Sequence, residues 1–168
     1  MTGVTYRLKS ETPLATLPAD EAAARLALSA QPLLVLSEDQ ELIALLAAVT
    51  NPVHEVRAAG SESDFSEDLL RCHAGVAVLD CAALTTPVGE LARRLRAQFP
   101  ELVLIVAGRV ADQERLAGEI SVGTVHRFLH KPLSEQRVRL FVDAAWRRHG
   151  EVRSAPRGSF APTMRARR

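Results

Sequence analysis

Aromatic side chains are scarce in this sequence and make up 4% of its 168 residues. Few rings are therefore available for stacking the bases of a single-stranded nucleic acid, which disfavours that class of binding protein. Two cysteines, Cys72 and Cys81, are too few for a disulfide scaffold and suit a reducing compartment. No apolar run approaches the roughly 20 residues that span a bilayer, and the polar start lacks the pattern of a signal peptide. We therefore expect a cytoplasmic protein.

Lysine is also nearly missing, because Lys9 and Lys131 are the only two in a chain that otherwise uses arginine. An ammonium and a planar guanidinium are not interchangeable, so a lysine at position 131 suggests a specific requirement. From residue 151 onward five arginines face one glutamate, which gives this end +4 and leaves −3 for the rest of a chain whose total is +1. A mildly acidic body is a poor nucleic-acid surface, and we expect no nucleic-acid binding by it.

Short apolar runs alternate along the chain with segments of helical periodicity. This alternation is typical of βαβ units, and continuous apolar runs are typical of parallel strands covered on both faces. The pattern therefore predicts an α/β fold with a doubly wound, five-stranded parallel sheet. The predicted strands cover residues 33–36, 53–58, 76–79, 102–107 and 125–129, and the predicted helices cover residues 39–49, 61–72, 87–99, 112–120 and 134–148.

Composition divides the chain into three parts. Residues 1–31 form an N-terminal arm with a short alanine-rich helix over Asp20–Ser29, residues 32–148 form the α/β domain, and residues 149–168 form a basic, flexible tail or linker. The tail ends in Arg-Ala-Arg-Arg, a pattern typical of a juxtamembrane stretch or linker. One hypothesis is therefore that it leads to a membrane segment or a further domain.

Chemistry in such a sheet is expected beyond the carboxyl ends of the strands, where the ligand crevice of open parallel sheets lies. Carboxylates follow two of the predicted strands and a lysine follows the fifth. The residues concerned are Ser37, Glu38 and Asp39 after the first strand, Asp80 after the third, Ala107 and Gly108 after the fourth, and His130, Lys131 and Pro132 after the fifth. We expect these groups to converge on one rim.

Taken together, four of these segments resemble the receiver domain of bacterial two-component response regulators. They read Leu-Val-Leu-Ser-Glu-Asp at 34–39, Val-Ala-Val-Leu-Asp at 76–80, Leu-Ile-Val-Ala-Gly at 104–108 and Phe-Leu-His-Lys-Pro-Leu at 128–133. The resemblance covers about residues 32–148. It implies a flavodoxin-like (β/α)5 fold with strand order 2-1-3-4-5, and a lysine-proline peptide bond that is typically cis.

The resemblance also implies roles for individual residues. Asp80 matches the phosphoacceptor, and Lys131 matches the lysine that contacts the phosphoryl group. Glu38 falls at the metal-binding acid, so Glu38, Asp39 and Asp80 are the candidate ligands of a Mg²⁺ ion, which prefers oxygen donors. Phe128 stands at the switch aromatic. From the residues alone, Asp80 is also compatible with a loop cap, and Glu38 with Asp39 is compatible with a plain helix N-terminus.

Three positions depart from the receiver pattern. Ser37 replaces the first acid of the usual pair, and Ala107 replaces the hydroxyl residue that bonds the phosphoryl group. Ala83 and Leu84 stand where the family has Met-Pro. Loss of a charge-assisted hydrogen bond costs ~1.5–3 kcal/mol, which is comparable to the few kcal/mol that separate two switch states. The resemblance is therefore to a degenerate receiver, or pseudo-receiver.

The leading hypothesis is a signal-transduction module that binds another protein, is not an enzyme, has no catalytic residues or cofactor, and is not switched by phosphorylation. One alternative is a phosphorylatable receiver that uses Asp80 and Mg²⁺. Another is a small flavodoxin-like enzyme or nucleotide binder, although no glycine-rich fingerprint follows the first strand.

A protein partner or a second copy would bind through the face formed by helix 112–120, strand 125–129 and helix 134–148. This region is rich in arginine: Arg115, Arg127, Arg137, Arg139, Arg147 and Arg148.

Overall fold

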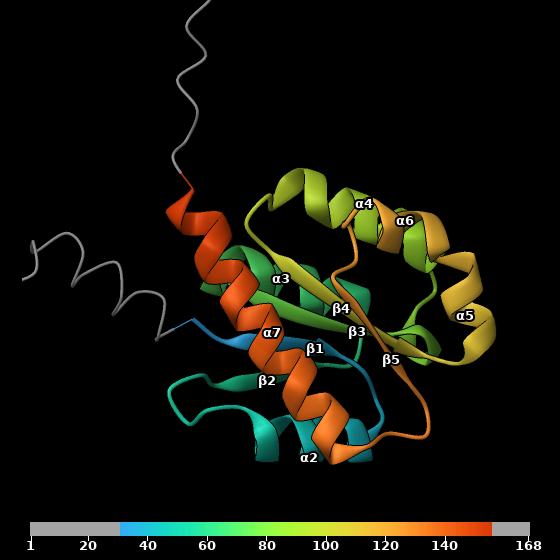
Figure 1. Cartoon of the computed structure of the whole chain (residues 1–168), viewed down its shortest axis with the longest axis horizontal. Helices are drawn as coiled ribbons and strands as arrows, with labels where there is room; N and C mark the ends of the chain where they lie inside the picture. The colour runs from blue at the N-terminus through green and yellow to red at the C-terminus, as the bar shows by residue number, and fades with distance from the viewer. Residues whose placement is uncertain (1–30, 156–168) are drawn as a thin grey trace, which may run out of the picture.

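The computed structural model describes residues 31–155. The predicted helix at Asp20–Ser29 and residues 156–168 of the predicted tail lie outside this range. A five-stranded, all-parallel sheet with the order β2-β1-β3-β4-β5 forms the centre of the domain (Figure 1). This arrangement confirms the predicted fold class and strand order. The strands are β1 (Leu33–Leu36), β2 (Val56–Ala59), β3 (Val76–Asp80), β4 (Val103–Gly108) and β5 (Arg127–His130).

Helices cover both faces of the sheet. On one face lie α2 (Gln40–Val49) and α7 (Glu135–Ser154), whose buried side chains share one core cluster. On the other face lie α3 (Glu62–Cys72), α4 (Val88–Gln98) and the two short helices α5 (Val110–Arg115) and α6 (Ala117–Ser121). A short 3₁₀ turn, η1 (Cys81–Ala83), follows β3. This is the two-sided covering expected for a parallel sheet.

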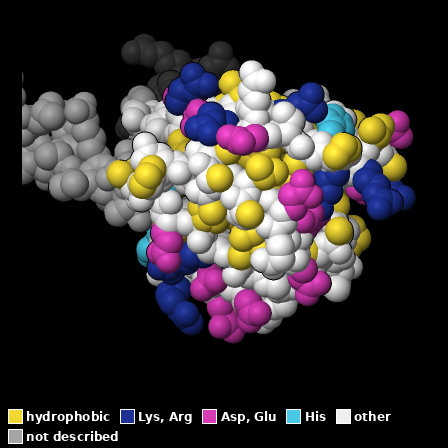
Figure 2. Space-filling model, turned by 90° about the horizontal axis from the view of Figure 1, so that it is seen from below, with side chains coloured by type: hydrophobic (Ala, Val, Ile, Leu, Met, Phe, Trp, Pro, Cys, Tyr) yellow, Lys and Arg dark blue, Asp and Glu magenta, His cyan; other side chains and the backbone are white. Residues whose placement is uncertain are grey.

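The outer side of α2 is unusual, because every residue from Leu42 to Val49 is apolar. Leu42, Leu46 and Val49 are buried against the sheet, but Ala44 and Ala48 are exposed. Figure 2 views the molecule from the side on which α2 lies in Figure 1, and hydrophobic side chains gather near the middle of this face. α2 therefore lacks the polar outer face that surface helices usually carry.

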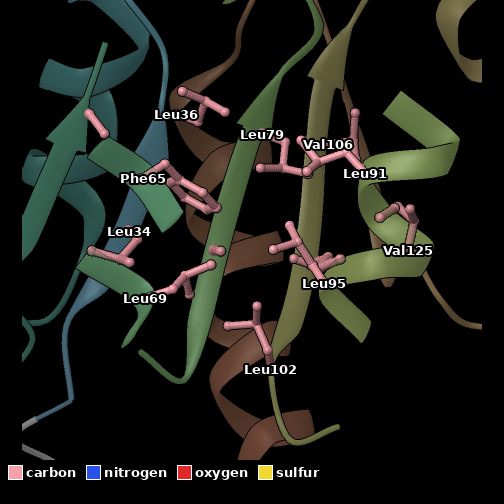
Figure 3. Packing of buried hydrophobic residues seen from close by; sticks show 14 of the residues in the cluster. Leu34, Leu36, Phe65, Leu69, Leu79, Leu91, Leu95, Leu102, Val106 and Val125 are labelled. Carbon is pink, nitrogen blue, oxygen red and sulfur yellow. The ribbon is translucent and has the colours of Figure 1, made fainter. Parts of the chain in front are cut away.

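Alternation along each strand sends side chains to two separate cores. Leu34, Leu79 and Val106 point toward α3 and α4, where they pack with Phe65 and Leu95 (Figure 3). The intervening positions point toward α2 and α7; these are Leu33, Val35, Val76, Val78, Val103 and Ile105. Since all of these side chains are buried, the strand ends are held rigidly and fix the positions of the residues that follow them.

Three elements differ most from the prediction, while the others shift by at most two residues. The second strand begins at Val56 rather than at residue 53, because Asn51 accepts hydrogen bonds from the backbone N–H groups of Val53 and His54 and so forms a turn. The helix predicted over 112–120 is two short helices separated at Leu116. The last helix continues past residue 148 to Ser154, so the first residues assigned to the tail are helical. Within residues 31–155, no helix is both long and apolar enough to cross a membrane.

Candidate functional site

Three strand ends meet at one edge of the sheet, as the sequence predicts. Asp80 is the last residue of β3, Ser37 follows β1, and Lys131 follows β5. The register places Leu36 beside Leu79 and therefore brings the ends of β1 and β3 together. The resulting cluster of Ser37, Asp39, Asp80 and Lys131 is called the rim cluster below.

The carboxylate of Asp80 is buried and fully engaged. Only 1% of the surface of Asp80 is exposed to solvent. Oδ2 accepts a hydrogen bond of 2.7 Å from the Ser37 hydroxyl and one of 2.9 Å from the Lys131 ammonium. Oδ1 accepts from the backbone N–H of Ala82 at 3.1 Å and so caps η1. Asp80 thus caps the loop, which is one of the two alternatives that the sequence left open, and it is the last residue of β3.

Asp39 also combines two roles. Oδ1 accepts from the backbone N–H groups of Glu41 and Leu42 and caps α2. Oδ2 accepts from the Lys131 ammonium at 2.8 Å. The ammonium therefore bridges two carboxylates that come from different strand ends. The Ser37 hydroxyl supports this arrangement, since it also accepts from the backbone N–H of Asp39 at 2.9 Å.

The bridge shifts the pKa values of Asp39 and Lys131. The hydrogen bond from Lys131 lowers the pKa of Asp39, and the backbone N–H groups of Leu42 and Glu41 lower it further, against the opposing effect of burial. Burial alone would lower the pKa of Lys131, but its hydrogen bonds with Asp39 and Asp80 outweigh burial and raise that pKa. Both shifts favour the charged forms, so Asp39 and Lys131 form an ion pair across the neutral pH range.

The resemblance assigns switch roles to two positions, and the structure places them within β4 and β5. Ala107 pairs with Asp80 in the β3–β4 register, is fully buried and carries no hydroxyl. Phe128 is 6% exposed and faces the core between the sheet and α4, with its ring edge against His130. The Lys131–Pro132 peptide bond is cis.

Glu38 is not brought into the rim cluster. Its side chain is exposed, and its carboxylate lies near Gly60, after β2. The four carboxylate oxygens of Asp39 and Asp80 already accept hydrogen bonds, and an ammonium stands between the two groups. Among residues 31–155 no group of three or more His, Cys, Asp and Glu side chains is placed to hold a metal ion. This donor set therefore fits an ammonium and does not fit Mg²⁺, which needs several free oxygen ligands in octahedral geometry.

A pocket of about 290 Å³ opens beside Asp80 and Lys131, and its wall includes Cys81, Arg109 and Asp112. Burial raises the pKa of the Cys81 thiol to about 11, with the carboxylates of Asp112 and Asp80 adding to the effect. The thiol is therefore protonated at neutral pH and is a poor nucleophile.

One contact near the rim cluster was not predicted from the sequence. Glu62, in the first turn of α3, accepts hydrogen bonds from the backbone N–H and the hydroxyl of both Thr85 and Thr86, at 2.7–3.0 Å. These bonds, led by the backbone N–H of Thr86, lower the pKa of Glu62 to about 2. Glu62 thereby fastens the loop that follows Asp80 and η1 to α3.

Comparison with known proteins supports the architecture. No family model and no curated protein matches this chain. Solved structures do match, and we compare three of them. The signal receiver domain of an HD domain-containing protein from Pseudomonas fluorescens Pf-5 has a TM-score of 0.67 and 16% identity, covering 86% of this chain and 99% of that one. This chain has the receiver fold.

A response regulator receiver domain protein from Clostridium thermocellum aligns with a TM-score of 0.62 and 16% identity, over 73% of this chain and 98% of that one. An adenylate cyclase from Rhodopirellula baltica aligns with a TM-score of 0.61 and 20% identity, over 74% and 93%. Identities this low establish the receiver fold alone, because one fold hosts many functions. The function of this chain has to be argued from the rim cluster.

Replacement of Lys131 by methionine tests the bridge. The change leaves the buried charge of Asp80 without its counterion. Removing one partner of a buried pair costs about 3–5 kcal/mol, and because the Lys131 side chain is 23% exposed we expect about 2–3 kcal/mol in urea unfolding. The additional change Asp80→Asn removes the stranded charge and should recover part of the loss.

The control for this prediction is Arg148→Met. Arg148 forms an exposed ion pair with Glu151 on α7, and loss of such a pair costs at most about 1 kcal/mol. If Lys131→Met unfolds at the same urea concentration as Arg148→Met, the bridge does not stabilise the domain.

The Glu62 contact gives a pH-dependent prediction. Since its pKa is lowered on folding from 4.5 to about 2, the ionised carboxylate adds stability above pH 4.5, and this contribution is lost as the pH falls through 2. The difference in unfolding free energy between the wild type and Glu62→Gln should be constant from pH 8 to 5 and shrink below pH 4.5. The exposed Glu67 on the same helix provides the matched Glu→Gln control. A difference independent of pH down to 3 would contradict the prediction.

Proposed function

We propose that this protein is a receiver-like signalling module that works by binding another protein and is not switched by phosphorylation. One observation carries the proposal: the Lys131 ammonium is bound by both Asp39 and Asp80, so an internal cation holds the carboxylate that would be the phosphoacceptor. In this proposal the module needs no Mg²⁺ or other cofactor and performs no catalytic turnover.

Two further features of the rim support the proposal. The Ser37 hydroxyl donates to the Oδ2 atom of Asp80, which would have to be free to attack a phosphoryl donor. Ala107, opposite Asp80, offers no hydroxyl to bond a phosphoryl group and draw the following loop inward. A phosphoryl group added to Asp80 would therefore lack the contact that favours a second conformation, and a ligand shifts an equilibrium only through such a difference in affinity.

The second candidate is a receiver that does accept a phosphoryl group at Asp80. It is favoured by the position of Asp80 at the end of β3, 2.9 Å from the Lys131 ammonium, and by the pocket of about 290 Å³ beside these two residues. In this alternative Lys131 would leave Asp39 and neutralise the phosphoryl oxygens, as lysine does in phosphate sites.

For partner binding we propose the face formed by α5, α6, β5 and the adjoining side of α7. Val110 and Val122 are more than half exposed there, and Arg127 is exposed on β5. Apolar side chains framed by arginine fit a protein surface that carries carboxylates. Arg139, which the sequence analysis counted with this face, instead lines a groove between α2 and α7.

A phosphodonor experiment separates the two candidates. The wild type is incubated with acetyl phosphate and Mg²⁺, and its intact mass is compared with that of Asp80→Asn. We expect no Asp80-dependent gain of a phosphoryl group. As a positive control, the double variant Ser37→Asp/Ala107→Thr restores an acid and a hydroxyl at the rim and should gain the group. A phosphoryl group on the wild type that Asp80→Asn lacks would overturn the proposal in favour of the second candidate.

A further inference from the structure

A groove of about 520 Å³ lies at the amino ends of the strands, at the end of the sheet opposite the rim cluster. More apolar than polar surface lines it, and the apolar lining residues are Ala74, Phe99, Pro100, Leu102, Val152 and Ala155. Glu101 and Arg153 also line the groove, and they form an ion pair of 3.9 Å. These two charges therefore offset each other, and the groove suits an uncharged, apolar occupant.

Gln31 fixes the point at which the chain enters the domain, and Gln31 itself lines the groove. Its backbone carbonyl accepts a hydrogen bond of 2.9 Å from Nδ1 of His54, and its side-chain Oε1 bonds Nε2 of the buried His149 at 2.7 Å. A Cβ atom on Gly75 would come within 3 Å of both the His149 and the Gln31 side chains, so this corner is tightly filled. The residues before Gln31 are thus tethered to the wall of the groove, which gives them a high effective concentration there.

The segment that precedes Gln31 is amphipathic in sequence. On the helix that the sequence predicts over Asp20–Ser29, Glu21 and Arg25 lie four residues apart on one side. The opposite side is a stripe of apolar residues three or four positions apart, namely Ala19, Ala23, Leu26 and Ala30. A helix with one apolar stripe is typical of a helix that packs on a surface.

We propose that residues 19–30 cover this groove within the same chain, with Leu26 packed against Phe99 and Val152. Leu26 precedes Gln31 by five residues, which is about 7.5 Å along a helix, so the tether keeps it over the groove. The alanines of the stripe allow the helix to lie close to the domain. The proposal does not depend on whether Asp80 is phosphorylated, because the groove contains no residue of the rim cluster.

The C-terminal tail is the other segment of this chain attached beside the groove, because Ala155 lines it. Residues 156–168 contain four arginines and no acidic residue. A cationic segment gains little from a groove whose Glu101 already pairs with Arg153. Residues 26–30, by contrast, carry no charge, which favours the N-terminal segment as the occupant.

The first test compares two leucines that lie on different sides of the predicted helix. Leu26→Asp places a charge in the covered stripe and should lower the urea midpoint of unfolding by about 0.5–1 M. Leu28→Asp is the matched control, since Leu28 lies on the side of Glu21 and Arg25, and it should leave the midpoint unchanged. In a Val152→Asp background Leu26→Asp should have no further effect, because the contact is already lost. The fluorescence of Trp146, the one tryptophan of the chain, follows the unfolding.

The second test traps the contact as a disulfide in the full chain, after Cys72→Ser and Cys81→Ser have removed the native thiols. Under mild oxidation Leu26→Cys/Val152→Cys should form a bond within one chain, detected as the loss of two hydrogens in the intact mass and reversed by a reducing thiol. Arg25→Cys/Val152→Cys is the matched control. It should form the bond at least about tenfold more slowly, because position 25 points away from the groove and a disulfide requires closely approaching Cβ atoms.

Three results would overturn the proposal. One is an equal urea midpoint for Leu26→Asp and Leu28→Asp. Another is a disulfide that links two chains, which would show that the segment covers the groove of a second copy. The third is a midpoint that Phe160→Asp lowers and Leu26→Asp does not, which would assign the groove to the C-terminal tail.

Discussion

The interaction on which the rim depends is the bridge from the Lys131 ammonium to the carboxylates of Asp39 and Asp80. Asp80 is buried, and a buried carboxylate needs a counterion because desolvation of an unpaired charge is costly. Lys131 supplies that counterion from β5, while Asp39 joins the bridge from the start of α2. One cation thereby ties together the ends of three strands, and the near absence of lysine elsewhere in the sequence agrees with a specific need for it at this position.

The same bridge determines which chemistry the rim supports. A divalent metal requires carboxylate oxygens that are free to bind it. A phosphoryl group on Asp80 requires an ammonium that is free to neutralise its oxygens. Here the Ser37 hydroxyl and the Lys131 ammonium share one oxygen of Asp80, and Ala107 contributes nothing at the position opposite. Near the rim cluster, Glu62 anchors the loop that follows Asp80 and η1 through four hydrogen bonds. Each of these contacts favours the arrangement of the rim cluster seen in the structure, which supports the proposed binding module.

Much of the fold could be predicted because three of its strands contain continuous apolar runs, as at residues 76–79. Such runs are typical of parallel strands that are covered on both faces. The predicted start of the second strand was wrong because the Asn51 turn uses one side-chain and one backbone hydrogen bond, which periodicity does not detect. The convergence of Asp39, Asp80 and Lys131 followed from topology alone. The hydrogen bonds of Ser37 and Glu62 did not, because they depend on side-chain rotamers and on the path of a loop, and no residue spacing encodes either. Glu38 lies outside the hydrogen-bonded rim cluster, since its carboxylate lies near Gly60, after β2.

A Mg²⁺ titration followed by amide NMR tests the central claim most directly. The backbone N–H groups of Ala82 and Glu41 each donate to a carboxylate of the bridge, so they report on any ion that displaces Lys131. The account predicts that these two resonances stay in place as Mg²⁺ is added to the wild type. Saturable shifts of both resonances at millimolar Mg²⁺ or below, without unfolding, would show that the ammonium yields its place to the metal and would contradict the account.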